Sequence, residues 1–282
     1  MKRSDVRVGV LRIEGTNSEE ESARCFRRLG AQAELVHLKQ FLKLDTWPGE
    51  ERNLSDFQIL FFAGGFSAGD YVRAGAIFAA RLKVGLGNEM AEYVKSGRLA
   101  IGACNGFQIL TEAGLLPNLA PGPMADLPEA CLFTNDSGHY ECRPVNLKHV
   151  NRGKNAFTKL IPHGEVRTIQ SAHGEGKLLV DRENEKRILK ELEDNDQIVF
   201  RYVDPNGELA GYPWNPNGVP GNIAGVCNRE GNVFGMMPHP ERVFYRHTHP
   251  DWTRTGLNVR GDDVGDGRAI FESALQYVEK KF

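Results

Sequence analysis

The sequence predicts an α/β protein whose sheet is mostly parallel and flanked by helices. Three short apolar runs support this prediction, because each one is followed by glycine or by an amphipathic stretch; they lie at 6–13, 58–65 and 98–104. Strands that alternate with helices pair in parallel, and the crossover helices cover both faces of the sheet. A composition with 40% hydrophobic and 26% charged residues is ordinary for a globular protein of this kind.

In the first half of the chain, strands alternate regularly with helices. Asn17 or Ser18 can cap the first helix, acidic residues suit its first turn, and Gly30 can end it. Gly85 and Gly87 can interrupt the longer helix that follows. In order, we expect a strand at 6–13, a helix between 17 and 30, strands at 33–38 and 58–65 around a polar stretch, a helix at about 75–96 and a strand at 98–104.

The second half contains fewer helices. We therefore expect antiparallel strands to extend the same sheet, so that residues 1–282 form a single domain with loop insertions near 41–55, 120–128, 181–195 and 246–265. The expected strands are at 143–150, 164–180, 196–203, 223–228 and 232–240, and the expected helices are at 183–195 and 269–281.

The charge and hydropathy of the chain exclude several classes of partner. There are 35 basic and 37 acidic residues, which leave a net charge of -2 and no broad basic surface for nucleic acid or an anionic membrane. No stretch reaches the roughly 18 apolar residues that a membrane span needs. We expect a soluble cytoplasmic protein.

The chain has five cysteines, an odd number, and they are widely spaced without a CxxC pair. Neither disulfides nor a zinc site is expected, and four of the five are expected to be buried structural residues. His247, His249 and Asp251 could suggest a metal site, but a solvated loop is the better interpretation because no matching ligand cluster occurs elsewhere. We therefore predict no metal.

Cys104 differs from the other cysteines in its surroundings. It lies between an apolar strand and an amphipathic helix that stops at Gly114, with Gly102 and Gly106 two residues to either side. A nucleophile elbow has this order, because its strained turn needs small residues where strand and helix pack closely. The helix dipole favours negative charge on the sulfur, and the N–H of Asn105 is suitably placed to donate to an oxyanion. Cys104 is therefore a candidate nucleophile.

A thiol nucleophile needs a base, and the base needs an orienting group. Among the eight histidines, His239 follows an apolar strand in a turn between two prolines, and Glu241 lies two residues further on. If the backbone is extended there, both side chains point the same way. A His-x-Glu sequence is a weak signal on its own, and a merely structural pair remains an open alternative.

Taken together, these motifs resemble the class I glutamine amidotransferases, whose glutaminase domain uses a Cys-His-Glu triad on a flavodoxin-like α/β sheet. Within that class, the sequence is similar to the family of glutaminase subunits of phosphoribosylformylglycinamidine synthase, which acts in purine biosynthesis. The segments that carry the resemblance are VGVLRIEGTN at 8–17, GGFSAGDYVRAGA at 64–76, IGACNGFQILTEAGLLP at 101–117, SAHGEGKLL at 171–179, NPNG at 215–218 and NIAGVCNREGNVFGMMPHPER at 222–242.

The resemblance implies roles for individual residues. Cys104, His239 and Glu241 would form the triad, and the N–H groups of Gly65 and Asn105 would form the oxyanion hole. Residues that would hold the substrate glutamine are Gln108, His173, Gly174 and Glu175. His173 is also the main rival of His239 for the role of base.

The resemblance also implies partners. Ammonia would pass to a separate synthetase subunit, accompanied by a small accessory subunit, that converts formylglycinamide ribonucleotide to formylglycinamidine ribonucleotide. ATP and Mg would be bound by that partner and no cofactor by this chain, which has no Walker A sequence.

Three alternatives remain from the sequence. The chain could be a class I glutaminase of another amination pathway, a cysteine hydrolase or peptidase on the same fold, or a subunit that has kept the fold without catalysis. Gln108 and the His-x-Glu pair argue against a peptidase, and the intact triad positions argue against a subunit without catalysis.

Overall fold

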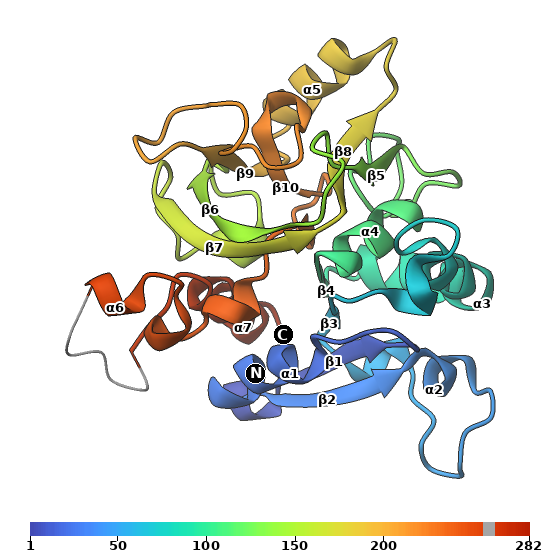
Figure 1. Ribbon diagram of the computed structural model, residues 1–282. Coiled ribbons are helices and arrows are strands. Elements are labelled where there is room, and N and C mark those ends of the chain that lie inside the picture. The colour runs from blue at the N-terminus through green and yellow to red at the C-terminus, as the bar shows by residue number, and fades with distance from the viewer. Residues whose placement is uncertain (256–262) are drawn as a thin grey trace.

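A computed structural model describes residues 1–255 and 263–282 (Figure 1). In this part of the chain, nine strands form one mixed sheet in the order β2-β1-β3-β4-β11-β10-β9-β6-β7, and two more strands form a separate ribbon. The first five strands of this order are mutually parallel, and the remaining neighbours pair antiparallel. The predicted α/β fold, mostly parallel with antiparallel strands in its second half, is confirmed.

The parallel strands are β1 (Arg7–Arg12), β2 (Gln32–His37), β3 (Ile59–Phe62), β4 (Leu99–Ala103) and β11 (Val233–Met236). The inner strands are buried and consist mainly of consecutive apolar residues, as expected for strands that helices cover on both faces. The edge strand β2 has a mixed sequence and is only partly buried. Because all five run in the same direction, their carboxyl ends meet at one edge, where α/β sheets bind their ligands.

The antiparallel part extends this sheet and curves away from it. It consists of β10 (Ile223–Cys227), β9 (Ile198–Val203), β6 (Glu141–His149) and β7 (Val166–His173). We expected a single strand at 164–180, but the chain bends at Gly174. Its second portion, β8 (Glu175–Val180), pairs with β5 (Ala130–Thr134), a strand that we did not predict. The bend brings residues 173–175 to the edge where the parallel strands end.

The helices cover the parallel strands from two sides, as Figure 1 shows. On one side are α1 (Glu19–Arg28) and α7 (Arg268–Lys281), whose Phe26 and Phe271 rings meet edge to face at 5.0 Å. On the other side are α3 (Ala76–Lys95) and α4 (Asn105–Glu112). Leu86 breaks α3 with a φ of −141°, between the two glycines at which an interruption was expected. Smaller helices are α2 (Leu38–Leu42), α5 (Glu185–Asp194) and α6 (Trp252–Thr255).

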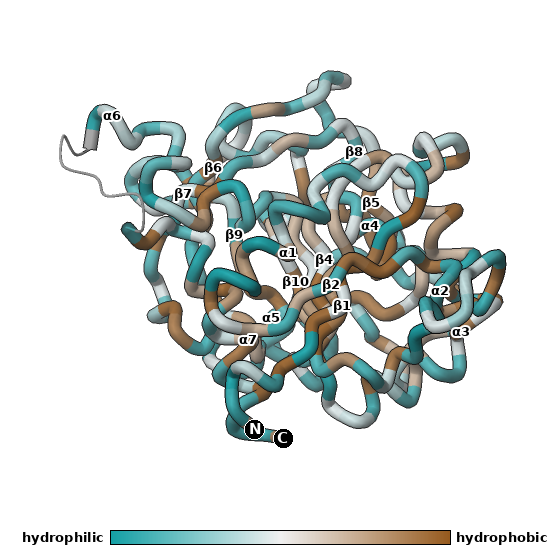
Figure 2. Tube along the Cα trace, turned by 90° about the horizontal axis from the view of Figure 1, so that it is seen from below, coloured by the Kyte–Doolittle hydropathy of each residue, from teal (hydrophilic) through white to brown (hydrophobic). Residues whose placement is uncertain are grey.

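The hydropathy of the chain follows this layering. In Figure 2, brown segments gather around the central strands while the outer loops are largely teal. No helix in the described ranges is both long enough and apolar enough to cross a bilayer. Part of the insertion expected at 246–265 lies outside the described residues, since 256–262 are not included.

Candidate active site

Cys104 lies in a sharp turn between β4 and α4, as the elbow predicts. Its φ of +52° and ψ of −110° are unusual for a residue with a side chain, so the surrounding structure must hold this conformation. A Cβ on Gly102 would run into the backbone of Gly106, and a Cβ on Gly106 would run into the carbonyl of Phe62. Glycine is therefore required at both positions for α4 to pack against the sheet.

His239 follows β11, the strand next to β4. An isolated bridge to β7 fixes its backbone, because its N–H donates to the carbonyl of Gln170 at 2.7 Å. Its ring rests against Gly64, where an added Cβ would approach Cε1 to 2.8 Å. Nδ1 of His239 lies 2.5 Å from Oε1 of Glu241, and both side chains are buried. An extended backbone was one way to align the pair; in the structure, a 3₁₀ turn at Pro240–Val243 brings the two side chains together.

The buried pair is strongly polarised. Burial acts to lower the pKa of His239, but the Glu241 carboxylate and the Cys104 sulfur outweigh it and raise the pKa to about 10. Burial likewise acts to raise the pKa of Glu241, and the His239 charge holds it below its ordinary value. The arrangement therefore favours an imidazolium between a carboxylate and a sulfur, which is the charge state that an acid in acyl transfer requires.

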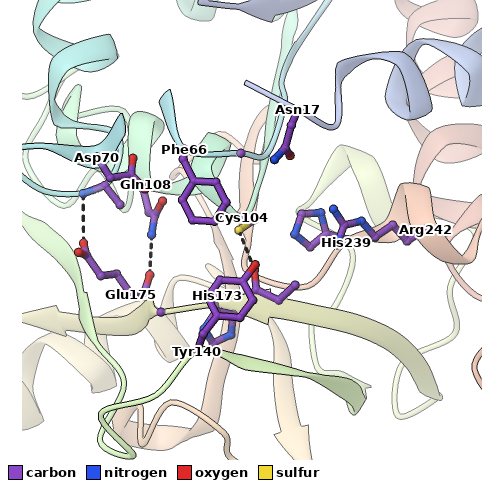
Figure 3. Close-up of a pocket in the computed structure, with 14 residues that line it drawn as sticks. Asn17, Phe66, Asp70, Cys104, Gln108, Tyr140, His173, Glu175, His239 and Arg242 are labelled. Carbon is purple, nitrogen blue, oxygen red and sulfur yellow. Dashed lines mark hydrogen bonds between the residues drawn. The ribbon is translucent and has the colours of Figure 1, made fainter. Parts of the chain in front are cut away.

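Cys104 opens into a cavity of about 260 Å³ at the carboxyl ends of the parallel strands (Figure 3). A cavity of this size fits a small molecule rather than a polymer. Of the residues predicted from the sequence, seven line it, namely Gly65, Cys104, Gln108, His173, Gly174, Glu175 and His239. Asn105 and Glu241 lie behind this lining, next to Cys104 and His239 respectively.

Of the two residues expected to form the oxyanion hole, Gly65 lines the same cavity as Cys104, and Asn105 follows Cys104 directly in the chain. Gly65 follows β3 with a φ of +145°, and a Cβ there would come within 2.7 Å of the Asn17 nitrogen and the Gly15 oxygen. Asn105 is the first residue of α4, and the N–H groups of a first helical turn have no partner within the helix. The geometry therefore allows both N–H groups to serve an oxyanion.

His173 also lines the cavity, and its buried ring has the opposite charge preference to that of His239. Burial lowers its pKa to about 3, and the charge on His239 adds to this effect. Nδ1 of His173 meets the amide oxygen of Asn135 at 3.1 Å, while Nε2 has no hydrogen-bond partner. His173 is therefore neutral and has one free ring nitrogen.

Gln108 and Glu175 are already hydrogen-bonded within the protein. The Gln108 amide donates to the backbone carbonyl of Glu175 at 2.6 Å, and the Glu175 carboxylate accepts from the N–H of Ala74 at 3.1 Å. These bonds join α4, β8 and the loop after β3 into one wall of the cavity.

The sequence did not point to several other residues that line the cavity: Asn17, Phe66, Asp70, Tyr140 and Arg242. Asp70 is half-buried, and burial raises its pKa to about 6. Tyr140 lies outside the segments that carried the family resemblance. The other four lie within those segments, but no local pattern marked them as residues of the site.

The other cysteines and the histidine pair lie away from the cavity. Cys25 and Cys227 are buried as expected, but Cys142 is exposed and Cys131 half-buried, so the expectation was wrong for those two. The solvated-loop interpretation was also wrong for His249, which is only 6% exposed and accepts from the N–H of Asp251. Among the residues described, no group of three His, Cys, Asp or Glu is arranged to hold a metal ion.

Comparison with known proteins agrees with this site. A family model for the CobB/CobQ-like glutamine amidotransferase domain matches residues 5–278. Phosphoribosylformylglycinamidine synthase subunit PurQ of Archaeoglobus fulgidus is 48% identical over 282 residues, which cover 99% of this chain and 100% of that protein. The protein of the same name from Picrophilus torridus is 43% identical, covering 94% and 96%. A chain in the solved structure of PurLQS from Thermotoga maritima has a TM-score of 0.69 and 30% identity, covering 97% of this chain and 99% of that one.

Proposed function

The chain belongs to the CobB/CobQ-like glutamine amidotransferase family, and on that premise we propose that it is the glutaminase subunit of a phosphoribosylformylglycinamidine synthase. It hydrolyses L-glutamine and delivers ammonia for the amination of formylglycinamide ribonucleotide in purine biosynthesis. The observation that carries the proposal is the strained Cys104 elbow, which opens into the same cavity as His239 with Glu241 directly behind it.

In the first half of the reaction, the Cys104 sulfur attacks the side-chain amide carbon of glutamine. The carbonyl oxygen becomes an oxyanion, which the N–H groups of Gly65 and Asn105 stabilise. The carbon–nitrogen bond then breaks, and the nitrogen leaves as ammonia with a proton from His239. The raised pKa of His239 supports this role, because the ring holds the proton until the leaving group needs it.

In the second half, water attacks the γ-glutamyl thioester on Cys104. His239, now neutral, accepts a proton from the water, and the thioester collapses to glutamate and the free thiol. Glu241 keeps the ring in one orientation through Nδ1 and leaves Nε2 for the reacting groups.

A separate synthetase subunit binds the ammonia acceptor. A small accessory subunit completes the complex. The solved relative, PurLQS, supports an assembly of this kind. Exposed aromatic side chains at the cavity also support it, because Phe66 and Tyr140 line the cavity yet are 47% and 52% exposed. Tyr71, in the same loop as Phe66, is 88% exposed. The same proposal locates the chain in the cytoplasm, with ATP and Mg bound by the synthetase rather than by this chain.

Replacement of Cys104 by alanine tests the proposal. In the assembled complex, Cys104→Ala should abolish amination of formylglycinamide ribonucleotide with glutamine and leave amination with ammonium salt unchanged. The exposed Cys142, replaced in the same way, is the matched control and should retain both activities. If the Cys104→Ala complex still used glutamine, the assignment would be wrong.

A further inference from the structure

The loop that bears Gly65 has a strained backbone. This loop, residues 65–75, connects β3 to α3, and we call it the oxyanion loop. Two of its residues with side chains, Ala68 and Asp70, each have a φ of +52°, and Gly65, Gly69 and Gly75 are also in the positive-φ region. Residues with side chains avoid this region at a cost of about 1 kcal/mol each. Contacts with the rest of the protein must therefore hold the loop in place.

Backbone hydrogen bonds tie the start of this loop to the turn after β1, because the N–H groups of Phe66 and Ala68 donate to the carbonyls of Gly15 and Glu14 at 2.9 and 2.8 Å.

The side chain of Asn105 ties the same part of the loop to α4. Its amide oxygen accepts from the N–H of Ser67 at 3.3 Å, and its amide nitrogen donates to the Asp70 carboxylate at 3.2 Å. The same nitrogen donates to the Gln108 side chain at 2.9 Å, which holds the amide in one orientation. Asn105 is only 1% exposed, so water does not compete for these bonds.

Other anchors hold the opposite end of the oxyanion loop. Arg73 forms a two-pronged ion pair with Glu112 of α4, and the N–H of Ala74 donates to Glu175. Both anchors lie eight or nine residues after Gly65 in the chain. The strained residues 68–70 lie between them and Gly65, and the backbone bonds to Gly15 and Glu14 fix the start of the loop relative to β1 rather than to α4. The Asn105 side chain is therefore the link between α4 and the part of the loop next to Gly65.

We propose that the Asn105 side chain is a positioning residue that fixes the two N–H donors of the oxyanion hole relative to each other. The backbone N–H of Asn105 is one donor. Its side-chain amide holds Ser67, which lies two residues after Gly65, the residue that supplies the other donor. The inference rests on the proposed function, in which the backbone N–H of Asn105 already serves the oxyanion. It adds a role for the Asn105 side chain. Glutamine hydrolysis needs the two N–H donors in this relative position, because its transition state carries an oxyanion. Simple alkylation of Cys104 forms no oxyanion and does not need it.

The test compares Asn105→Ala with Asn232→Ala in the assembled complex. Asn232 is a matched control, since it is 2% exposed and its amide donates to the carbonyls of Val94 and Arg98 at the opposite end of the strands. We expect Asn105→Ala to lower kcat for glutamate release between about 10- and 100-fold with KM nearly unchanged, and to leave the rate of Cys104 alkylation by iodoacetamide within about twofold. Asn232→Ala should lower thermal stability but leave kcat per folded molecule unchanged.

A reciprocal exchange provides a rescue. Asn105→Asp alone sets two carboxylates against each other, and kcat should fall. Adding Asp70→Asn restores the hydrogen bond between positions 105 and 70 with donor and acceptor exchanged, although the bond to the Gln108 oxygen stays lost. The kcat of the double variant should therefore recover in part, by at least several-fold over Asn105→Asp. Unchanged kcat in Asn105→Ala, loss of alkylation together with kcat, or no recovery in the exchange would each overturn the proposal. Retained glutamine use in Cys104→Ala would instead overturn the proposed function itself.

Discussion

The parallel and antiparallel parts of the sheet each bring one buried histidine to the cavity, and the two histidines have opposite charge preferences. His239 follows β11 in the parallel part, and its pKa is raised to about 10. His173 ends β7 in the antiparallel part, and its pKa is lowered to about 3. Both side chains are equally hidden from water, at 2% exposure, so burial cannot account for the difference.

The charged groups near each ring account for the difference in pKa, above all the group that faces Nδ1. His239 meets the carboxylate of Glu241, whereas His173 meets the neutral amide of Asn135. A nearby negative charge stabilises an imidazolium, and a neutral amide does not compensate for desolvation. The comparison teaches that the partner of each histidine sets its charge, which supports the proposed proton-transfer role of His239 and leaves His173 as a neutral residue beside the cavity.

The largest effect should come from replacing the two histidines in turn. His239→Gln should reduce glutamine-dependent kcat about 1000-fold or more, because it removes the acid and base of both steps. His173→Gln should reduce it about tenfold at most, through poorer substrate binding. Steady-state kinetics of both variants in the assembled complex measure this, and equal losses would remove the distinction between the two residues.

A smaller effect is expected when the partner of His239 loses its charge. Glu241→Gln should lower kcat about 100-fold and lower the pKa of His239, because burial then acts without an opposing carboxylate. The imidazole signals of the variant, followed by NMR against pH, should titrate at lower pH than in the parent protein. An unchanged His239 titration would show that Glu241 does not set its charge.

The smallest effect concerns stability in acid. The pKa of His173 is lower in the folded protein than its ordinary 6.5, so the unfolded chain binds a proton that the folded chain does not. The stability that the neutral ring contributes is complete above pH 6.5. It declines as the pH falls toward 3, by about 1.4 kcal/mol per pH unit in that window. The difference in unfolding free energy between His173→Gln and the parent should therefore shift in favour of the variant between pH 6.5 and 5. A constant difference would contradict a buried neutral His173.

The elbow could be predicted from sequence because its signal is local. A strand, a cysteine between glycines and a helix follow each other directly around Cys104, and the structure has the same order. The pairing of His239 with Glu241 is also local, although a turn rather than an extended segment aligns the two side chains.

The partners of these residues could not be predicted in the same way. Asn135 reaches His173 across 38 positions of sequence, and Asn105 reaches Ser67 across the same separation. Strand β5 was missed for a related reason, since its only pairing partner in the described chain is β8, beyond the bend at Gly174. Such contacts depend on how the sheet brings distant segments together, and no spacing within a segment records them.

Trapping the acyl intermediate tests the central claim most directly. The assembled complex, turning over isotopically labelled glutamine, is quenched in acid and its peptides are mapped by mass spectrometry. The account predicts a labelled γ-glutamyl group on the peptide containing Cys104, more of it in Glu241→Gln if deacylation slows, and none on peptides with Cys25, Cys131, Cys142 or Cys227. Label on another cysteine, or glutamate release without label on Cys104, would contradict it.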